Sequence, residues 1–523
     1  MKKLTLTLLS FTLTFSMFAG GIVTNTNQSA AWSRMLVRDA STDIDAAFFN
    51  PAGLTKLDDG FHLSLSSQTI SQTRNIYNDA LDENYGGSTF APVFPDFYAV
   101  YKTGKVAFSF GFTPIGGGGT AEFPDGLPSF EMPVSGAADL FAPDVTGYSM
   151  DASLEGSSIY FGYQLGVSYE INDMISIYAG GRYVMASNSY TGAMKDISFV
   201  ANSTGGSVPA DDYMNGVADQ AYAGATQLYG YADMMEPSLP TYGAYTFDQA
   251  IDYANSEGDA ATAGAITALR DGLTGLTGAD AGDMTINEGH ATYNTYGDGY
   301  TAQGDMISAG ADQMGDGAVD AVQTGSGFTP IVGLNLSLME EKLNIGIKYE
   351  FKTNLELTNE TTTDDFGMFP NGEVINADMP AMLSVGVGYK LTDALYATFG
   401  FHTYFDKEVG WENVDDIDKG SMEYGLGLEY AISEQLLVSM GWLGTKSGVK
   451  DSYHNDLNQS YDTNTLGLGG AYRINDMLNI QLGGYYTFYN EYAIEYDGYS
   501  QTYSKTNIGF AIGLDFTFGG GGE

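Results

Sequence analysis

Four basic side chains have the type and position that anion binding requires: Arg182, Lys348, Lys352 and His402. Each stands in a segment where apolar and polar residues alternate, on the polar face. Successive side chains of a strand point to opposite faces, so all four are predicted to face one interior. A cation in such an interior binds a carboxylate by a charge-assisted hydrogen bond, which makes them candidates for holding a ligand's acid group. The alternative is pairing with interior acids such as Glu350, Glu423 and Glu429.

Other chemistry has little basis in the sequence. The chain has no Cys, which excludes disulfides and thiolate sites. Its four His occur without a paired-His motif or a Gly-x-Ser-x-Gly elbow. Acid clusters at 415–418 and at Asp312, Asp316 and Asp320 match no complete calcium loop, so solvated loop charge is expected there. We therefore expect no enzyme activity, no metal and no cofactor.

The elements that must position the basic residues are strands. In 501–518, Ile508, Phe510 and Ile512 form one face, while Asn507 and Gly509 lie on the other. The segments 175–190 and 342–358 alternate in the same way. Such long apolar faces opposite a Gly-rich polar face suit a wall between lipid and a lumen.

A short polar turn recurs between these strands, starting at Tyr169, Tyr389, Tyr430 and Tyr472. Asn, Asp and Ser supply the turn geometry. Short turns on one side and longer loops on the other are typical of a transmembrane β-barrel. Fourteen strands are predicted, at 60–73, 96–102, 105–113, 157–169, 175–190, 328–338, 342–358, 380–390, 394–408, 420–431, 436–449, 461–473, 477–492 and 501–518. The predicted fold is all-β, a 14-stranded antiparallel barrel.

Composition agrees with a barrel. The chain contains 68 Gly, 37 Tyr and 29 Phe, and only 16% of its residues are charged, against about 25% in soluble proteins. Aromatic girdles and small lumen residues account for this bias. The formal net charge of -44 disfavours nucleic acid as a partner, since the phosphate backbone requires Lys and Arg.

The chain is predicted to have four further parts besides the barrel, which spans 59–518. Residues 1–20 are a predicted signal peptide, because Lys2 and Lys3 precede an apolar run followed by small residues. Residues 21–58 carry no strand period and either fill the lumen or hang in the periplasm. Residues 191–327 form a long acidic insertion, extracellular by turn parity, with one short helix near Ile266. Residues 519–523 are a tail.

The segment ahead of the first strand resembles a known family. Thr24-Asn25-Thr26-Asn27-Gln28, Arg38-Asp39-Ala40 and Phe49-Asn50-Pro51-Ala52-Gly53-Leu54 are similar to the N-terminal hatch of the FadL/TodX outer-membrane transporters. Asn50, Pro51, Ala52 and Gly53 are the most specific part. The order of signal, hatch and fourteen strands covers the whole mature chain. The long insertion departs from the family.

The resemblance implies a monomeric barrel in the outer membrane of a Gram-negative bacterium. Its expected cargo is long-chain fatty acids or other hydrophobic molecules, with outer-membrane lipids as surroundings. It also implies that the hatch, 21–58, is folded inside the lumen and that a lateral opening lies at a kink in the third strand. Here that strand runs into Pro114 and four glycines after Gly111, and Pro cannot donate to a sheet ladder. Gly111 and Pro114 are therefore the predicted gate. Alternatives are an aqueous porin, a channel for aromatic hydrocarbons, and a surface adhesion barrel that binds a partner through 191–327.

Overall fold

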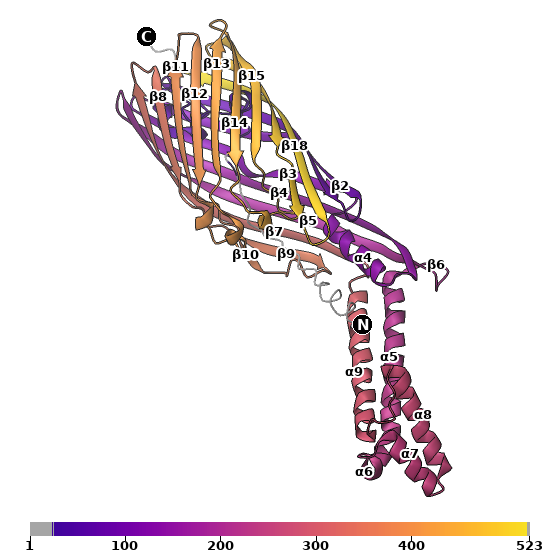
Figure 1. The fold of residues 1–523 in the computed structure, drawn as a ribbon. Helices are drawn as coiled ribbons and strands as arrows, with labels where there is room; N and C mark the ends of the chain where they lie inside the picture. The colour runs from indigo at the N-terminus through magenta and orange to yellow at the C-terminus, as the bar shows by residue number, and fades with distance from the viewer. Residues whose placement is uncertain (1–23, 25, 520–523) are drawn as a thin grey trace. The chain divides into compact units, whose positions relative to one another are not determined.

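One antiparallel sheet closes on itself to form the wall of the molecule (Figure 1). The structure is a computed structural model that describes residue 24 and residues 26–519. The predicted signal peptide, 1–20, and residues 520–523 of the predicted tail lie outside the described residues. These residues form two units, a barrel unit (24, 26–132, 151–194 and 317–519) and a helical unit (133–150 and 195–316).

The wall is a closed 14-stranded antiparallel barrel, as predicted. Its first and last strands pair from Phe61 opposite Phe518 to Asn78 opposite Gln501. The wall strands are β1 (Gly60–Asn78), β2 (Glu83–Thr103), β3 (Val106–Phe123), β4 (Val145–Asn172), β5 (Ile175–Ala201), β7 (Gly317–Leu338), β8 (Leu343–Glu350), β11 (Met382–Lys390), β12 (Leu395–Tyr404), β13 (Met422–Ala431), β14 (Leu436–Lys446), β15 (Thr463–Asn475), β16 (Leu478–Tyr489) and β18 (Ser500–Phe518).

Apolar residues cover the outer face of this wall. Leu426, Leu468 and Phe510 are 55%, 64% and 62% exposed, and each alternates with a residue on the inner face. Large apolar side chains at such exposure are costly in water, and a lipid-facing barrel presents them as a band. The period of two in the sequence therefore corresponds to an apolar outer face and a polar inner face.

Two predicted boundaries need correction. The strand predicted at 342–358 is interrupted after Glu350 and resumes as β9 (Glu356–Asp364), which pairs with β7. The ladder between β5 and β7 also continues well into 191–327, to Met194 opposite Gly317. The alternation was missed there because both faces are polar around Ser187 to Thr191, although backbone pairing needs no apolar side chain.

Short strands extend two of these hairpins. β10 (Val374–Asn376) pairs with β9, and β17 (Tyr492–Glu495) pairs with the start of β18. A third short strand, β6 (Gly206–Pro209), pairs with the end of β5 inside the helical unit. The first residues of β4 and part of helix α4 (Pro128–Leu140) also belong to that unit.

The N-terminal segment, defined here as residues 26–57, packs as three short helices with almost no exposed surface. They are α2 (Ala30–Met35), α3 (Ala46–Phe49) and the 3-10 helix η2 (Pro51–Lys56). All residues of α2 and α3 are buried. Trp32, Phe48 and Phe49 join the largest apolar cluster of the barrel unit. The segment thus shares an apolar core with the wall and also makes polar contacts to it.

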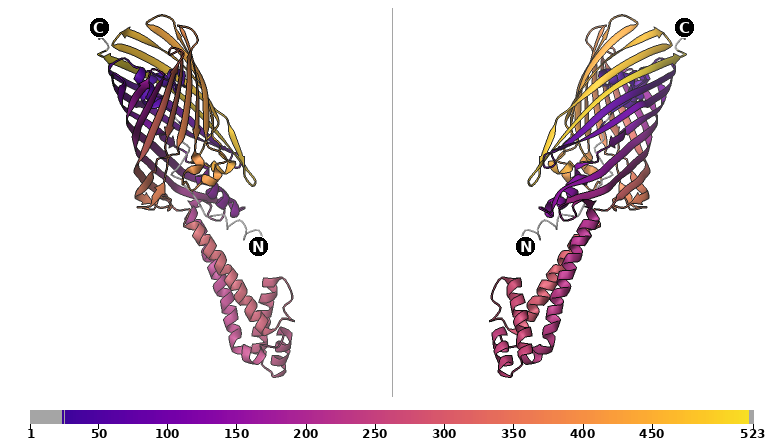
Figure 2. Two further views of the ribbon diagram at one scale, coloured as in Figure 1. Left: turned by 90° about the vertical axis from the view of Figure 1, so that its left-hand side faces the viewer. Right: turned by 90° about the vertical axis from the view of Figure 1, so that its right-hand side faces the viewer.

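The helical unit is built from α5 (Ala210–Met235), α6 (Leu239–Tyr242), α7 (Phe247–Ser256), α8 (Ala260–Thr277) and α9 (Ile286–Ala311). α5 and α9 run side by side (Figure 2). Their contact uses small residues under tyrosine rings: Tyr229 lies against Gly297 and Tyr222 against Gly304. The helix predicted near Ile266 is α8. Among the described residues, no helix is both long and apolar enough to cross a membrane.

Candidate functional site

Two of the predicted cations, Arg182 of β5 and Lys348 of β8, lie around one carboxylate. Arg182 donates to both oxygens of Glu350, at 2.7 and 3.0 Å, and Lys348 Nζ lies 2.7 Å from the same group. Both cations also face the ring of Phe48, at 4.9 and 4.7 Å from its centroid. Lys348 further donates to the Phe48 carbonyl at 2.8 Å. We call Arg182, Lys348 and Glu350 the Glu350 cluster.

His402 of β12 is held between two acids. Its ring nitrogens lie 2.7 Å from Asp39 of the N-terminal segment and 3.0 Å from Glu423 of β13. Ser384 of β11 donates to Asp39 at 2.7 Å. Burial alone would raise the pKa of Asp39, but His402 and the Ser384 hydroxyl hold it below its ordinary value. His402 therefore joins the segment to the wall.

Lys352 lies in the interruption between β8 and β9, outside the ladder from which its direction was predicted. Its Nζ is 2.7 Å from Asp378, and its side chain is 38% exposed. Pairing with acids, the alternative considered from the sequence, is thus what the structure contains for Arg182, Lys348, Lys352 and His402. Glu429, however, pairs with Arg34 of the segment. That any of the four holds a ligand's acid group stays a prediction.

The Asn-Pro-Ala-Gly sequence of the segment lies directly against the wall. Asn50 donates to Asn335 of β7 at 2.7 Å and to the Ser41 carbonyl at 2.9 Å. The Pro51 carbonyl accepts a bond of 2.6 Å from Ser168 of β4. A Cβ at Gly53 would lie 2.7 Å from the Ser41 carbonyl, so only glycine fits. Ala52 is fully buried.

Glycines on the inner wall make room for the segment. A Cβ at Gly346 would lie 2.2 Å from the Asp39 carbonyl, and one at Gly441 would lie 1.7 Å from the Met35 carbonyl. Gly386 and Gly483 also meet segment backbone at under 3.0 Å. Part of the Gly-rich inner face therefore consists of positions where the segment contacts the wall too closely for a side chain. We call Gly346, Gly386, Gly441 and Gly483 the glycine seats.

The third strand is irregular where the gate was predicted. β2 and β3 pair from Phe97 to Thr103 and again at Ser88 and Thr89, with no pairs between. The unpaired stretches, 90–96 and 113–120, contain Pro92, Pro95 and Pro114, which lack the N–H of a ladder. Against β4, β3 carries two extra residues, Ile115 and Gly118. Gly111 remains paired with Tyr98, and the break begins at Thr113, directly before Pro114.

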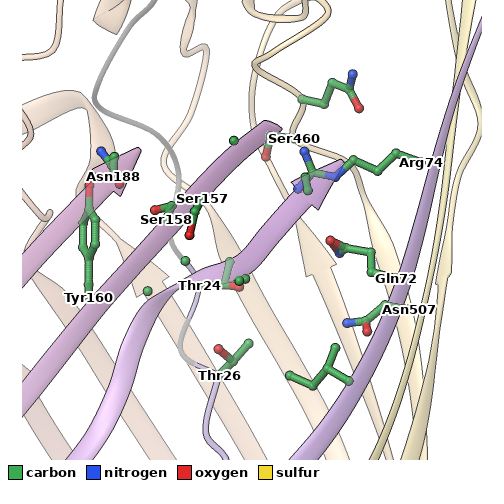
Figure 3. Close-up of a pocket in the computed structure, with 18 of the residues that line it drawn as sticks. Thr24, Thr26, Gln72, Arg74, Ser157, Ser158, Tyr160, Asn188, Ser460 and Asn507 are labelled. Atoms are coloured by element: carbon green, nitrogen blue, oxygen red, sulfur yellow. The ribbon is translucent and has the colours of Figure 1, made fainter. Parts of the chain in front are cut away.

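A cavity of about 480 Å³ lies inside the barrel unit and reaches this break. Ligand pockets are commonly ~300–1,000 Å³. Phe94 and Gly116 to Gly119 line it from the unpaired stretches, and Trp32 lines it from the N-terminal segment. Figure 3 shows Arg74, Gln72 and Asn507 among its walls. A smaller cavity of about 190 Å³ shares Thr24, Trp32 and Lys505 with it.

The loop between β14 and β15 covers part of this cavity. Tyr453 and Asp456 line it, and His454 stacks on Tyr492 at 4.2 Å between centroids. Burial lowers the pKa of His454 to about 4, which the nearby Asp451 only partly offsets. Burial also raises the pKa of Asp456, although bonds from Ser129 and Gln501 oppose that shift.

Sequence reasoning missed two cations of this cavity, Arg74 of β1 and Lys505 of β18. Lys505 falls on the inner face by the same alternation that places Asn507 there. Arg74 was missed because the first strand was predicted to end at 73, whereas β1 continues to Asn78. Extending the predicted first strand by one residue would have placed Arg74 on the inner face.

By sequence, no family model and no curated protein matches the chain. By structure, it is similar to the toluene transporter TodX of Pseudomonas putida, at 13% identity and TM-score 0.52, covering 91% of this chain and 94% of that one. It is also similar to a Pseudomonas aeruginosa FadL homologue, at 12% identity and TM-score 0.56, covering 96% and 100%. The chain thus has the fold of FadL-type transporters, as the resemblance implied.

Proposed function

We propose that this barrel carries hydrophobic molecules, chiefly long-chain fatty acids, across the outer membrane of a Gram-negative bacterium by passive uptake. The observation that carries the proposal is the unpaired stretch between β2 and β3, which borders the cavity. An opening of the ladder beside a ligand-sized cavity supplies a sideways route into lipid. An aqueous porin has no use for such a break.

The proposed path has three steps. External loops take the molecule from water, the cavity above the N-terminal segment binds it, and it leaves through the wall between β2 and β3. Release into lipid matters energetically, because returning an alkyl chain to water costs about 0.8 kcal/mol per CH₂. A lateral exit avoids this cost at every methylene.

The N-terminal segment acts in this proposal as the hatch below the cavity. Its links to the wall include polar pairs, such as Asp39 with His402 and Asn50 with Asn335, and polar pairs can be exchanged as the segment shifts. Such a shift would also uncover the Glu350 cluster, which Phe48 now covers. Arg182 and Lys348 are then available to an acid group during passage.

Aromatic hydrocarbons are a second candidate cargo. The structurally similar TodX is described as a toluene transporter, and the same route would serve a small uncharged ring. Both cargoes require the break, so one experiment addresses the route for either of them.

The experiment straightens β3. Deleting Ile115 and Gly118 removes both extra residues against β4, and Pro114→Val restores a backbone donor. We expect a heat-modifiable barrel that still binds ligand but no longer supports uptake of radiolabelled oleate by cells. The matched control is Gly118→Ala, which keeps the bulge and has nothing within 4 Å of the added Cβ. Its uptake should equal that of the wild type.

Normal uptake by the straightened, well-expressed variant would contradict lateral exit and favour movement along the axis. Uptake of a small hydrophilic sugar at porin rates by the wild type would contradict the transporter proposal itself.

A further inference from the structure

Two cations face each other inside the cavity. Arg74 and Lys505 are direct partners in the β1–β18 ladder, so their side chains project from the same face of the wall. Both line the cavity. The next inward pair along the ladder is Gln72 with Asn507. Figure 3 shows Arg74 reaching from β1 into the cavity, beside Gln72 and Asn507.

Neither cation has an acidic partner among the described residues. No ion pair or hydrogen bond of either side chain is present there, and the Arg74 Nε is buried without an acceptor. Lys505 Nζ lies over the face of Tyr489, 4.9 Å from the ring centroid. Residues 1–23 and Asn25 contain no Asp or Glu, so the N-terminal part of the chain cannot supply one.

The two acids that line the cavity are engaged elsewhere. Asp378 binds Lys352 at 2.7 Å and the Leu355 amide at 2.9 Å. Asp456 accepts from the Ser129 amide at 2.8 Å and from Gln501 at 3.2 Å. The cavity therefore contains two basic side chains that no carboxylate in its lining pairs with.

A like-charged pair opposite in a ladder lowers stability. Side chains that cost stability without a structural role are typical of binding sites. The rest of the cavity indicates what the pair binds. Phe94, Phe123 and Leu154 line it with apolar surface, and the Gly116–Gly119 stretch opens it toward the break in the wall.

We infer that Arg74 and Lys505 form an anion site that selects an amphiphile with one acidic head and an apolar tail, the head on the β1–β18 seam and the tail toward the break between β2 and β3. The inference rests on the proposed function only for the direction of travel. It adds to that function a choice of acids over uncharged hydrocarbons, made by residues distinct from the Glu350 cluster.

The test compares decanoate, decane-1-sulfonate and decan-1-ol, which share one chain length. Binding to purified full-length barrel in a neutral maltoside detergent is measured by calorimetry. The wild type should bind both anions at least about tenfold more tightly than the alcohol, the gain expected of charge-assisted hydrogen bonds. R74Q/K505Q should remove this advantage and leave the affinity for decan-1-ol unchanged.

Two further variants separate specific binding from general charge. R74K keeps the charge and should retain most of the preference for anions. K446Q/K407Q removes the same charge outside the cavity and should bind all three molecules like the wild type, because neither lysine lines it. Acidification below the pKa of decanoate should weaken decanoate binding but not sulfonate binding.

Stability gives a second readout. Because R74Q/K505Q relieves like-charge repulsion, its barrel should melt at the same or a higher temperature than the wild type without ligand. A lower melting temperature together with equal losses for anions and alcohol would mean that the pair supports the wall, and would overturn the inference. Wild-type protein that binds decanoate no better than decan-1-ol would also overturn it.

Uptake distinguishes the two proposals. Cells carrying R74Q/K505Q should still take up an uncharged hydrocarbon such as toluene while losing decanoate uptake. If wild-type cells take up neither molecule, the proposed function fails, but the binding comparison on purified protein still decides the anion site.

Discussion

The Glu350 cluster and the Arg74–Lys505 pair both contain two basic side chains, but they differ in whether an acid is bonded to them. Each brings two inward-facing basic side chains together, Arg74 and Lys505 on the paired strands β1 and β18, and Arg182 and Lys348 on β5 and β8 with β7 between them. In the first, Glu350 bonds both cations and Phe48 covers them. In the second, no acid among the described residues is bonded, and the side chains border a cavity. This difference makes the Arg74–Lys505 pair the first of the two to test as a ligand site.

The two regions also differ in what a ligand must displace. Access to the Glu350 cluster requires movement of the N-terminal segment, whereas the pair already lines a cavity. We therefore place initial binding at the cavity pair and assign to the cluster a role in holding the segment.

Removing the carboxylate of the cluster should unfold or loosen the barrel. Glu350→Gln leaves Arg182 and Lys348 buried without a counter-charge, and breaking a buried pair in this way costs about 3–5 kcal/mol. The loss would be measured as a lower urea midpoint in detergent. Glu360→Gln, on the exposed part of β9, is the control and should have little effect. A stable E350Q barrel would mean that the cluster is not structural.

Filling one glycine seat should expose the cluster without affecting the cavity pair. A Cβ at Gly346 would meet the Asp39 carbonyl at 2.2 Å, and overpacking costs about 1–3 kcal/mol, so G346A should dislodge the segment. Lys348 should then react with an amine-directed acylating reagent, detected by mass spectrometry. Lys505 should react equally in wild type and variant. Unchanged protection of Lys348 would contradict the seating role.

Giving the cavity pair its own acid should make it resemble the cluster. Asn507→Asp places a carboxylate on the inner face two residues from Lys505 and diagonal to Arg74. Decanoate affinity should fall about tenfold, because an internal anion replaces the ligand's. Calorimetry would measure this. The control, Asn464→Asp, lies outside the cavity and should bind decanoate normally.

Lowering the pH should destabilise the loop between β14 and β15 without affecting the Glu350 cluster. Burial lowers the pKa of His454 to about 4 from an ordinary 6.5, so the loop's stability is full above pH 6.5 and falls toward pH 4 as the unfolded form takes up the proton. Hydrogen exchange of residues 447–462, corrected for intrinsic rates, should quicken from pH 7.5 to pH 5. His454→Gln should abolish this dependence. Equal quickening around Glu350 would argue against a local effect.

Much of the wall follows from the sequence because strand periodicity is a direct consequence of backbone geometry. The alternation of side chains along a strand correctly predicted that Arg182, Lys348 and His402 face inward. The same alternation does not apply to Lys352, because the chain leaves the ladder at Phe351 and side chains alternate regularly only within a strand. The break near Pro114 was predictable from the sequence, because proline lacks the backbone N–H that a ladder hydrogen bond requires.

Other features depend on partners far away in the chain. Lys348 stands two residues from Glu350, but Arg182, which shares the same carboxylate, is 168 residues away. In the same way, the sequence around Arg74 does not indicate whether an acid will pair with it. The glycine seats also depend on distant partners. From the sequence, Gly346 is only a small residue on the inner face, and its role depends on its contact with Asp39. Helix α8 was detectable from its apolar spacing, whereas α5 and α9 join through glycines and tyrosines, which leave little apolar periodicity.

The seats also bear on the order in which the molecule assembles. Residues 26–57 leave the ribosome before any strand, yet Gly346, Gly386, Gly441 and Gly483, which receive them, belong to strands made late in the chain. This early segment therefore acquires its last partners only when late strands have been made. It must be enclosed before β18 pairs with β1, because that seam closes the ring. Chains truncated before β11 should consequently present this apolar segment to chaperones and proteases, however well their first strands pair.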